Sequence, residues 1–222
     1  MAVSKKHVNC VLEAVEDEGN PVLHVAPSKA QVAGIPPEWA AVLASPDART
    51  QVVDVVWGPV SRRVPKIIQS MKRHLQGVGV LTTDSRPPSL IYFLTLEDKE
   101  PDFYRGYLPA KKLPPVAKSL PSEFLDFYKV HDGWVDQFEF LGPMRSTGWH
   151  PLSGDARTPS AKFLVVLVAS GGALLGFDLR KSPALCYVIP SGDDPPEIVP
   201  KIWTRLDKWI ATQWEDLLPF SK

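Results

Sequence analysis

Three apolar runs separated by tight turns constrain the fold of this chain more than any other feature. The stretch FLVVLVASGGALLGFDL covers residues 163–179, and Ser170, Gly171 and Gly172 interrupt it with the small residues of a hairpin turn. A third run, residues 184–189, follows a turn that contains Pro183. Consecutive strands joined by tight turns predict an antiparallel meander. Because helices precede and follow these strands, we expect the α+β class, with a meander sheet flanked by helices.

The last predicted element is a helix over residues 201–218, KIWTRLDKWIATQWEDLL. Pro200 precedes it and Pro219 follows it, where a proline cannot continue a helix. Its apolar side chains recur at helical spacing and predict a face that packs on the sheet: Trp203, Leu206, Ile210, Trp214 and Leu217.

A second capped helix is predicted over residues 121–131, within LPSEFLDFYKVHDGW. Pro121 suits the first helical position, and Glu123 in the first turn favours the helix dipole. Leu120, Phe124, Phe127, Tyr128 and His131 share one face. Gly133 follows where the chain needs a positive φ to leave the helix.

The first half of the chain carries weaker signals. We predict helices over residues 37–44 and 65–75, and strands over residues 51–57 and 90–96. Residues 97–119 are charged and then rich in proline, so they are the best linker candidate. This divides the chain into an additional N-terminal α/β segment, residues 1–109, and a C-terminal α+β domain, residues 110–222. Whether the first segment belongs to the same sheet stays open.

Composition places the chain among ordinary globular proteins. Its 25 basic and 25 acidic residues cancel, which gives no reason to expect nucleic acid or an anionic membrane as a partner. The two cysteines, Cys10 and Cys186, are typical of reduced thiols rather than of a disulfide framework. No secretory signal and no apolar run of helical membrane-spanning length is present, so a soluble, cytoplasmic protein is expected.

Catalytic motifs are absent from the sequence. Phosphate-binding loops, nucleophile elbows and the HExxH zinc motif are all missing. One group, His131, Asp132, His150 and Asp155, has the residue types of a metal site or an acid–base pair. The positions of His131 at a helix end and of Asp132 before a glycine are equally typical of helix-end and turn chemistry. We therefore expect no enzyme activity, no metal and no cofactor.

The C-terminal half resembles the SUKH superfamily, which includes the Smi/Knr-type cell-wall regulators and many bacterial immunity proteins. The resemblance rests on the helix LPSEFLDFYKVHDGW, on Gly148-Trp149-His150-Pro151-Leu152, on the meander FLVVLVASGGALLGFDL and on the closing helix. It covers roughly residues 110–222. At the helix end the family reads Asn-Gly or Asn-Gly-Gly, where this chain has His131-Asp132-Gly133.

The resemblance implies a non-enzymatic immunity-type protein that binds a cognate protein toxin in the cytoplasm and blocks it by occlusion. The alternative is a regulatory or scaffold module that docks on cellular proteins without a toxin. Trp134 and Trp149 suit either an exposed binding anchor or a core. Acidic side chains that would clamp a basic partner complete the candidate partner-binding set, which is Asp132, Trp134, Asp136, Glu139, Trp149, Asp155, Asp193, Asp194 and Glu197.

Overall fold

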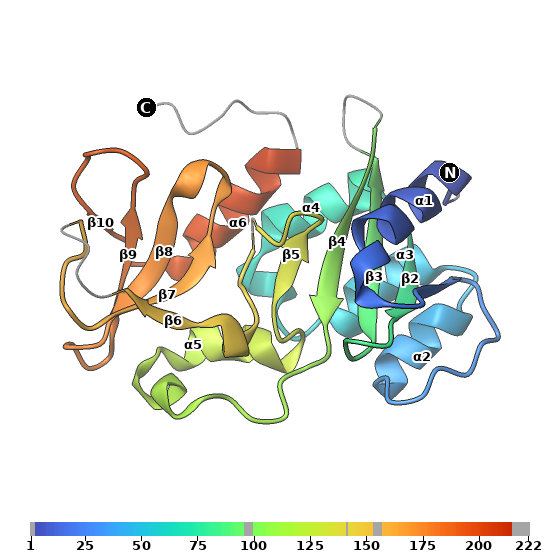
Figure 1. Ribbon diagram of the computed structural model, residues 1–222, viewed down its shortest axis with the longest axis horizontal. Helices are drawn as coiled ribbons and strands as arrows, with labels where there is room; N and C mark the ends of the chain where they lie inside the picture. The colour runs from blue at the N-terminus through green and yellow to red at the C-terminus, as the bar shows by residue number, and fades with distance from the viewer. Residues whose placement is uncertain (1–2, 96–99, 141, 153–156, 215–222) are drawn as a thin grey trace.

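A computed structural model describes residues 3–95, 100–140, 142–152 and 157–214. Within them the fold is α+β, with six α-helices and two antiparallel sheets of five strands each (Figure 1). The helices are α1 (Lys5–Ala14), α2 (Pro37–Ala44), α3 (Ala48–Gln51), α4 (Pro65–His74), α5 (Ser122–Leu125) and α6 (Ile202–Trp214). None of the described helices is long and apolar enough to cross a membrane.

Each sheet is a meander in which every strand pairs with its neighbours in sequence. The first sheet holds β1 (Val22–Val25), β2 (Leu75–Thr82), β3 (Ser89–Thr95), β4 (Pro101–Tyr107) and β5 (Trp134–Asp136). The second holds β6 (His150–Leu152), β7 (Phe163–Val168), β8 (Leu174–Asp178), β9 (Leu185–Ile189) and β10 (Glu197–Ile198). The predicted hairpin turn lies between β7 and β8, where Gly171 and Gly172 have φ of 80° and 82°.

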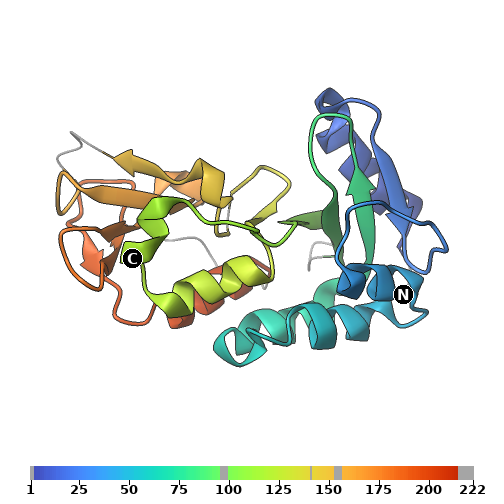
Figure 2. The same ribbon diagram turned by 90° about the horizontal axis from the view of Figure 1, so that it is seen from below.

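The two predicted segments contribute to one sheet and one core. Strand β5 belongs to the second segment, yet it pairs with β4 of the first, with Gly106 opposite Trp134. Figure 2 shows the two sheets side by side, with α4 and α6 running along the same side of the molecule. The N-terminal segment is thus joined to the rest of the chain by strand pairing as well as by the peptide link.

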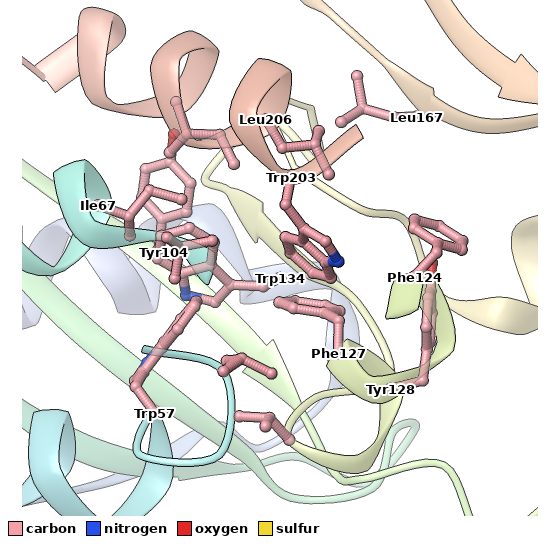
Figure 3. Packing of buried hydrophobic residues seen from close by; sticks show 14 of the residues in the cluster. Trp57, Ile67, Tyr104, Phe124, Phe127, Tyr128, Trp134, Leu167, Trp203 and Leu206 are labelled. Atoms are coloured by element: carbon pink, nitrogen blue, oxygen red, sulfur yellow. The ribbon is translucent and has the colours of Figure 1, made fainter. Parts of the chain in front are cut away.

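An aromatic cluster fills the space between the sheets and the helices (Figure 3). Trp134 is fully buried, and its ring centroid lies 4.7 Å from that of Trp57 and 4.5 Å from that of Tyr104. Trp203 of α6 packs on Phe127, at 5.9 Å between centroids. Aromatic rings bury large areas and dominate core energetics. The cluster therefore couples the stability of the two halves.

A carboxylate from α6 caps the N-terminus of α4. Pro65 is the first residue of α4 and has no N–H group, so Lys66 and Ile67 supply the free donors of the first turn. Both donate to the buried Asp207 side chain, at 3.1 Å to Oδ2 and 2.8 Å to Oδ1. This is an N-cap supplied by a helix 140 residues away in sequence.

Replacing this cap is expected to destabilise the whole protein. Asp207→Ala leaves the N–H groups of Lys66 and Ile67 without their acceptor, so we expect the free energy of unfolding to fall by about 2–3 kcal/mol. Asp194→Ala is the matched control, because Asp194 is exposed, and it should change stability by less than about 0.5 kcal/mol. Urea unfolding followed by tryptophan fluorescence measures both values. Equal stability of the two variants would contradict the capping role.

The predicted strand over residues 51–57 is wrong. This stretch continues α3 as a π-helical segment, residues Val52–Val56. Its valines favour a strand by propensity. However, Val52, Val53, Val56 and Trp57 are all buried, and this spacing places them on one face of a helix. Burial against the core outweighs the modest cost of β-branched residues in a helix.

The predicted linker, residues 97–119, is wrong in its central part. Strand β4 occupies Pro101–Tyr107 and lies between β3 and β5. The charged residues of this stretch suggested an exposed linker, but Arg105 is only 4% exposed and forms an ion pair with Glu18. Strand β2 was not predicted either, since Gly77 and Gly79 break the apolar alternation of LQGVGVLT.

Candidate functional site

The residues His131, Asp132 and Gly133 organise the junction between the two sheets. His131 is fully buried. Its Nδ1 lies 3.0 Å from the Tyr107 carbonyl, which only accepts, so Nδ1 carries the proton. Nε2 then accepts from the Tyr92 hydroxyl at 2.7 Å, and that hydroxyl accepts from Trp57 Nε1 at 3.0 Å. Burial lowers the pKa of His131 to about 4, so the ring is neutral at physiological pH.

Asp132 and Gly133 position the segment that carries Arg145. The Asp132 carboxylate accepts from the Ser146 N–H at 2.8 Å. Gly133 has φ of 98°, and a Cβ there would meet the Arg145 backbone nitrogen at 2.6 Å. Met144 N–H donates to the Val166 carbonyl of β7 at 3.1 Å. Residues 144–146 are therefore held between the turn after α5 and the second sheet.

Tyr107, at the end of β4, is the centre of a charged cluster. Its hydroxyl accepts from Arg86 Nη1 at 3.2 Å and donates to Glu139 Oε1 at 3.1 Å. The guanidinium carbons of Arg105 and Arg145 lie 5.0 Å and 4.7 Å from the centroid of its ring. Burial raises the pKa of the Tyr107 hydroxyl, which keeps it protonated. Three guanidinium groups thus converge on one tyrosine.

The chain after β5 forms a projecting loop, residues 136–140. The Asp136 Oδ1 accepts from the N–H groups of Phe138 at 3.0 Å and of Phe140 at 2.8 Å, which fixes the turn. Burial raises the pKa of Asp136, against the lowering effect of these two bonds. Glu139 adopts a φ of 62°. This loop leaves the Phe138 side chain 67% exposed and that of Phe140 44% exposed.

Two hollows flank this aromatic loop. The first has a volume of about 580 Å³ and is lined by Arg86, Tyr107, Phe138, Phe140, Arg145 and His150 among others. The second, of about 750 Å³, lies between α1 and the start of β4, and Phe138 borders it as well. Phe138 therefore stands between two depressions on one surface. We call the loop and the first hollow the junction surface.

Both candidate tryptophans belong to the core, which is one of the two alternatives that the sequence left open, so neither is an exposed binding anchor. Trp134 is 0% exposed and Trp149 is 9% exposed. Trp149 Nε1 donates to the Tyr128 hydroxyl at 3.0 Å, and that hydroxyl donates to the Met144 carbonyl at 3.0 Å. Both tryptophan side chains fill the space between the sheets, so they are not available on the surface for a partner.

The candidate acidic residues do not form one patch. Asp132 and Asp136 are committed to backbone N–H groups, and of the described acidic candidates only Glu139 lines the first hollow. Asp193, Asp194 and Glu197 are exposed at the β9–β10 end of the other sheet, where Glu197 pairs with Arg205 at 3.1 Å. Asp155 lies outside the described residues.

The histidines do not form a catalytic pair. His131 is enclosed among Trp39, Trp57 and Phe127, whereas His150 is exposed and donates from Nδ1 to the Gly148 carbonyl at 3.0 Å. Within the described ranges, no three His, Cys, Asp or Glu side chains are grouped as metal ligands. Cys10 and Cys186 are both free thiols.

Sequence reasoning missed Phe138, Phe140, Arg86 and Arg145. The signal was present in part, because two phenylalanines separated by one glutamate after a short strand are unusual in a polar loop. Arg86 and Arg145 are far apart in sequence, and only the fold brings them to one tyrosine. Comparisons of the chain with protein-family models, with curated proteins and with solved structures find no match.

Proposed function

We propose that this protein acts by binding another protein, and that the partner is a cognate toxin that it neutralises by occlusion, as immunity proteins do. The proposal joins two supports. One is the resemblance of the C-terminal half to the SUKH superfamily. The other is the junction surface, which presents aromatic and arginine side chains, the residue types enriched where proteins bind proteins.

The observation that carries the proposal is the exposure of Phe138 and Phe140. Exposed aromatic side chains cost solvation free energy in an isolated protein, and their pairing on one loop indicates a surface that becomes covered. The loop is held rigidly by Asp136, so little conformational entropy is lost on binding. Flanking hollows provide room for side chains of the partner.

A tagged pull-down from the native host tests the proposal. We expect one stoichiometric partner that survives stringent washing and that arrests growth when it is expressed without this chain. Tight occlusion of a toxin requires an affinity of about nanomolar or better. Several partners that are lost on washing would favour the regulatory or scaffold alternative, and the absence of any partner would contradict both.

The double variant Phe138→Ala/Phe140→Ala is expected to weaken the captured complex by about 30-fold or more. Truncation of central aromatic anchors costs about 2 kcal/mol or more in comparable interfaces. Ile198→Ala is the control, because Ile198 is 54% exposed at the far edge of the second sheet. Isothermal titration with the purified partner measures the affinities. A larger loss with Ile198→Ala than with the double variant would place the interface at the β9–β10 end instead.

A further inference from the structure

Among the residues that the structure describes, Arg145 has no carboxylate as a counterion. Its guanidinium contacts the ring of Tyr107, and its Nε is buried with no acceptor among the residues that the structure describes. Arg145 also forms no ion pair within those residues. Buried donors in native proteins nearly always have a partner, and a charged donor loses most when it has none. The buried Nε is closed to a partner, but the Arg145 side chain lines the first hollow, where its charge can meet an acidic group from outside.

The neighbouring arginines are neutralised internally. Arg105 makes two bonds to the Glu18 carboxylate, at 2.6 Å and 2.9 Å. Arg86 pairs with Glu139 at 2.5 Å and approaches Glu18 at 3.3 Å. Burial acts to raise the pKa of Glu139, but the hydrogen bond and the charge of Arg86 outweigh it and lower the pKa. Two carboxylates thus serve three guanidiniums, and the surplus positive charge belongs to Arg145.

We propose that the first hollow of the junction surface binds an acidic side chain of the protein partner, with its carboxylate on Arg145 and its neighbouring apolar groups on Phe138 and Phe140. This inference rests on the proposed function and adds the chemistry of the partner. A guanidinium matches a carboxylate with two parallel N–H···O bonds. The expected partner surface is therefore acidic and apolar at this point, rather than basic.

The geometry favours a protein carboxylate over nucleic acid. A nucleic-acid surface needs a row of unneutralised cations along a backbone, and here only Arg145 is free of a carboxylate in the cluster of described residues. The phenylalanine rim suits apolar side chains that flank an acidic residue. The cluster already holds one carboxylate in this way. Glu139 accepts from the Arg86 guanidinium and from the Tyr107 hydroxyl, beside the ring that Arg145 contacts.

Short peptides test the chemistry with the full-length chain. The probe is an acetylated and amidated peptide of alternating Glu and Phe, compared with the same peptide in which Gln replaces Glu. Binding is followed at low salt by NMR of the arginine Nε–H groups. We expect saturable binding of the Glu peptide that shifts the Arg145 signal, and binding of the Gln peptide at least about tenfold weaker. Equal binding of both peptides, or none of the Glu peptide, would overturn the proposal without any change to the fold.

Variants connect the peptide to the site. Arg145→Gln should weaken the Glu peptide about tenfold or more. Arg205→Gln is the control, because Arg205 lies on α6 and pairs with Glu197 of β10, and it should leave the affinity unchanged. An unaltered affinity of Arg145→Gln, or tighter binding of a short DNA duplex than of the Glu peptide, contradicts the inference. If the captured partner is lost with Phe138→Ala/Phe140→Ala but bound normally by Arg145→Gln, the proposed function stands and the acidic contact fails.

Discussion

A fragment of residues 110–222 is expected not to fold on its own. Without the first segment, β5 loses its partner strand β4. Helix α6 loses α4, and the buried Asp207 side chain of α6 loses the N–H groups of Lys66 and Ile67 that it accepts from. The rings of Trp134 and Trp214 would also lose their contacts with Tyr104, at 4.5 Å and 5.2 Å between centroids. We expect the fragment to show no cooperative thermal transition and to expose its tryptophans to solvent, as their fluorescence would report.

Complementation separates an incomplete core from a simple loss of solubility. Adding residues 1–109 to the fragment should restore a cooperative transition, because the missing strand partner and aromatic rings return. A fragment of residues 110–222 that unfolds cooperatively by itself, with native-like dispersion of its NMR signals, would show that the second sheet and α6 form an independent domain. The shared core described above would then contribute little to stability.

His131→Ala is expected to destabilise the protein by about 3–5 kcal/mol. The substitution removes a buried ring and leaves the Tyr92 hydroxyl and the Tyr107 carbonyl without their partner. His150→Ala should change stability by less than about 0.5 kcal/mol, because His150 is exposed. Chemical unfolding of both variants measures the difference. A stable His131→Ala variant would contradict the structural role and would restore His131 as a candidate for chemistry.

The same histidine predicts a dependence of stability on pH. Its pKa falls from 6.5 to about 4 in the folded protein, so only the unfolded chain binds a proton between these values. The stability contributed by neutral His131 is therefore complete above about pH 6.5 and is lost as the pH falls toward 4, by about 3 kcal/mol in total. In His131→Gln, which has no ring to titrate, the free energy of unfolding should decline less steeply over this range. Parallel curves would contradict the prediction.

The second sheet was predictable because its signals are local. Strands β7, β8 and β9 are apolar runs of strand length, and their turns contain glycine or proline. The closing helix α6 was predictable from apolar side chains at helical spacing, and Trp203, Leu206, Ile210 and Trp214 are all buried, whereas Leu217 lies outside the described residues. Each of these elements depends on residues within a few positions in sequence, which is the information that periodicity and turn chemistry carry.

The first sheet was harder because its burial depends on distant partners. Arg105 can be buried inside β4 because Glu18, at the end of a short 3-10 helix before β1, supplies its counterion. The stretch Val52–Val56 is helical because most of its valines are buried against the core in that conformation, although their propensity favours a strand. Neither the Arg105–Glu18 ion pair nor the burial of these valines can be predicted from the neighbouring residues in sequence.

The candidate site divides in the same way. The turn at Gly133 was predictable from the helix end that precedes it. By contrast, the burial of Trp134 and Trp149 depends on rings from several elements, so the sequence left both alternatives open. The meeting of Arg86 and Arg145 on Tyr107 follows from the way the two sheets join. Surfaces built at such a junction are set by tertiary structure.

Hydrogen exchange on the full chain, alone and with its captured partner, tests the central claim most directly. If the partner covers the junction surface, the amides of residues 134–149 should exchange more slowly in the complex, and those of residues 184–198 should not change. Protection of residues 184–198 instead, around Asp193, Asp194 and Glu197, would contradict the claim and would place the interface on the acidic end of the second sheet.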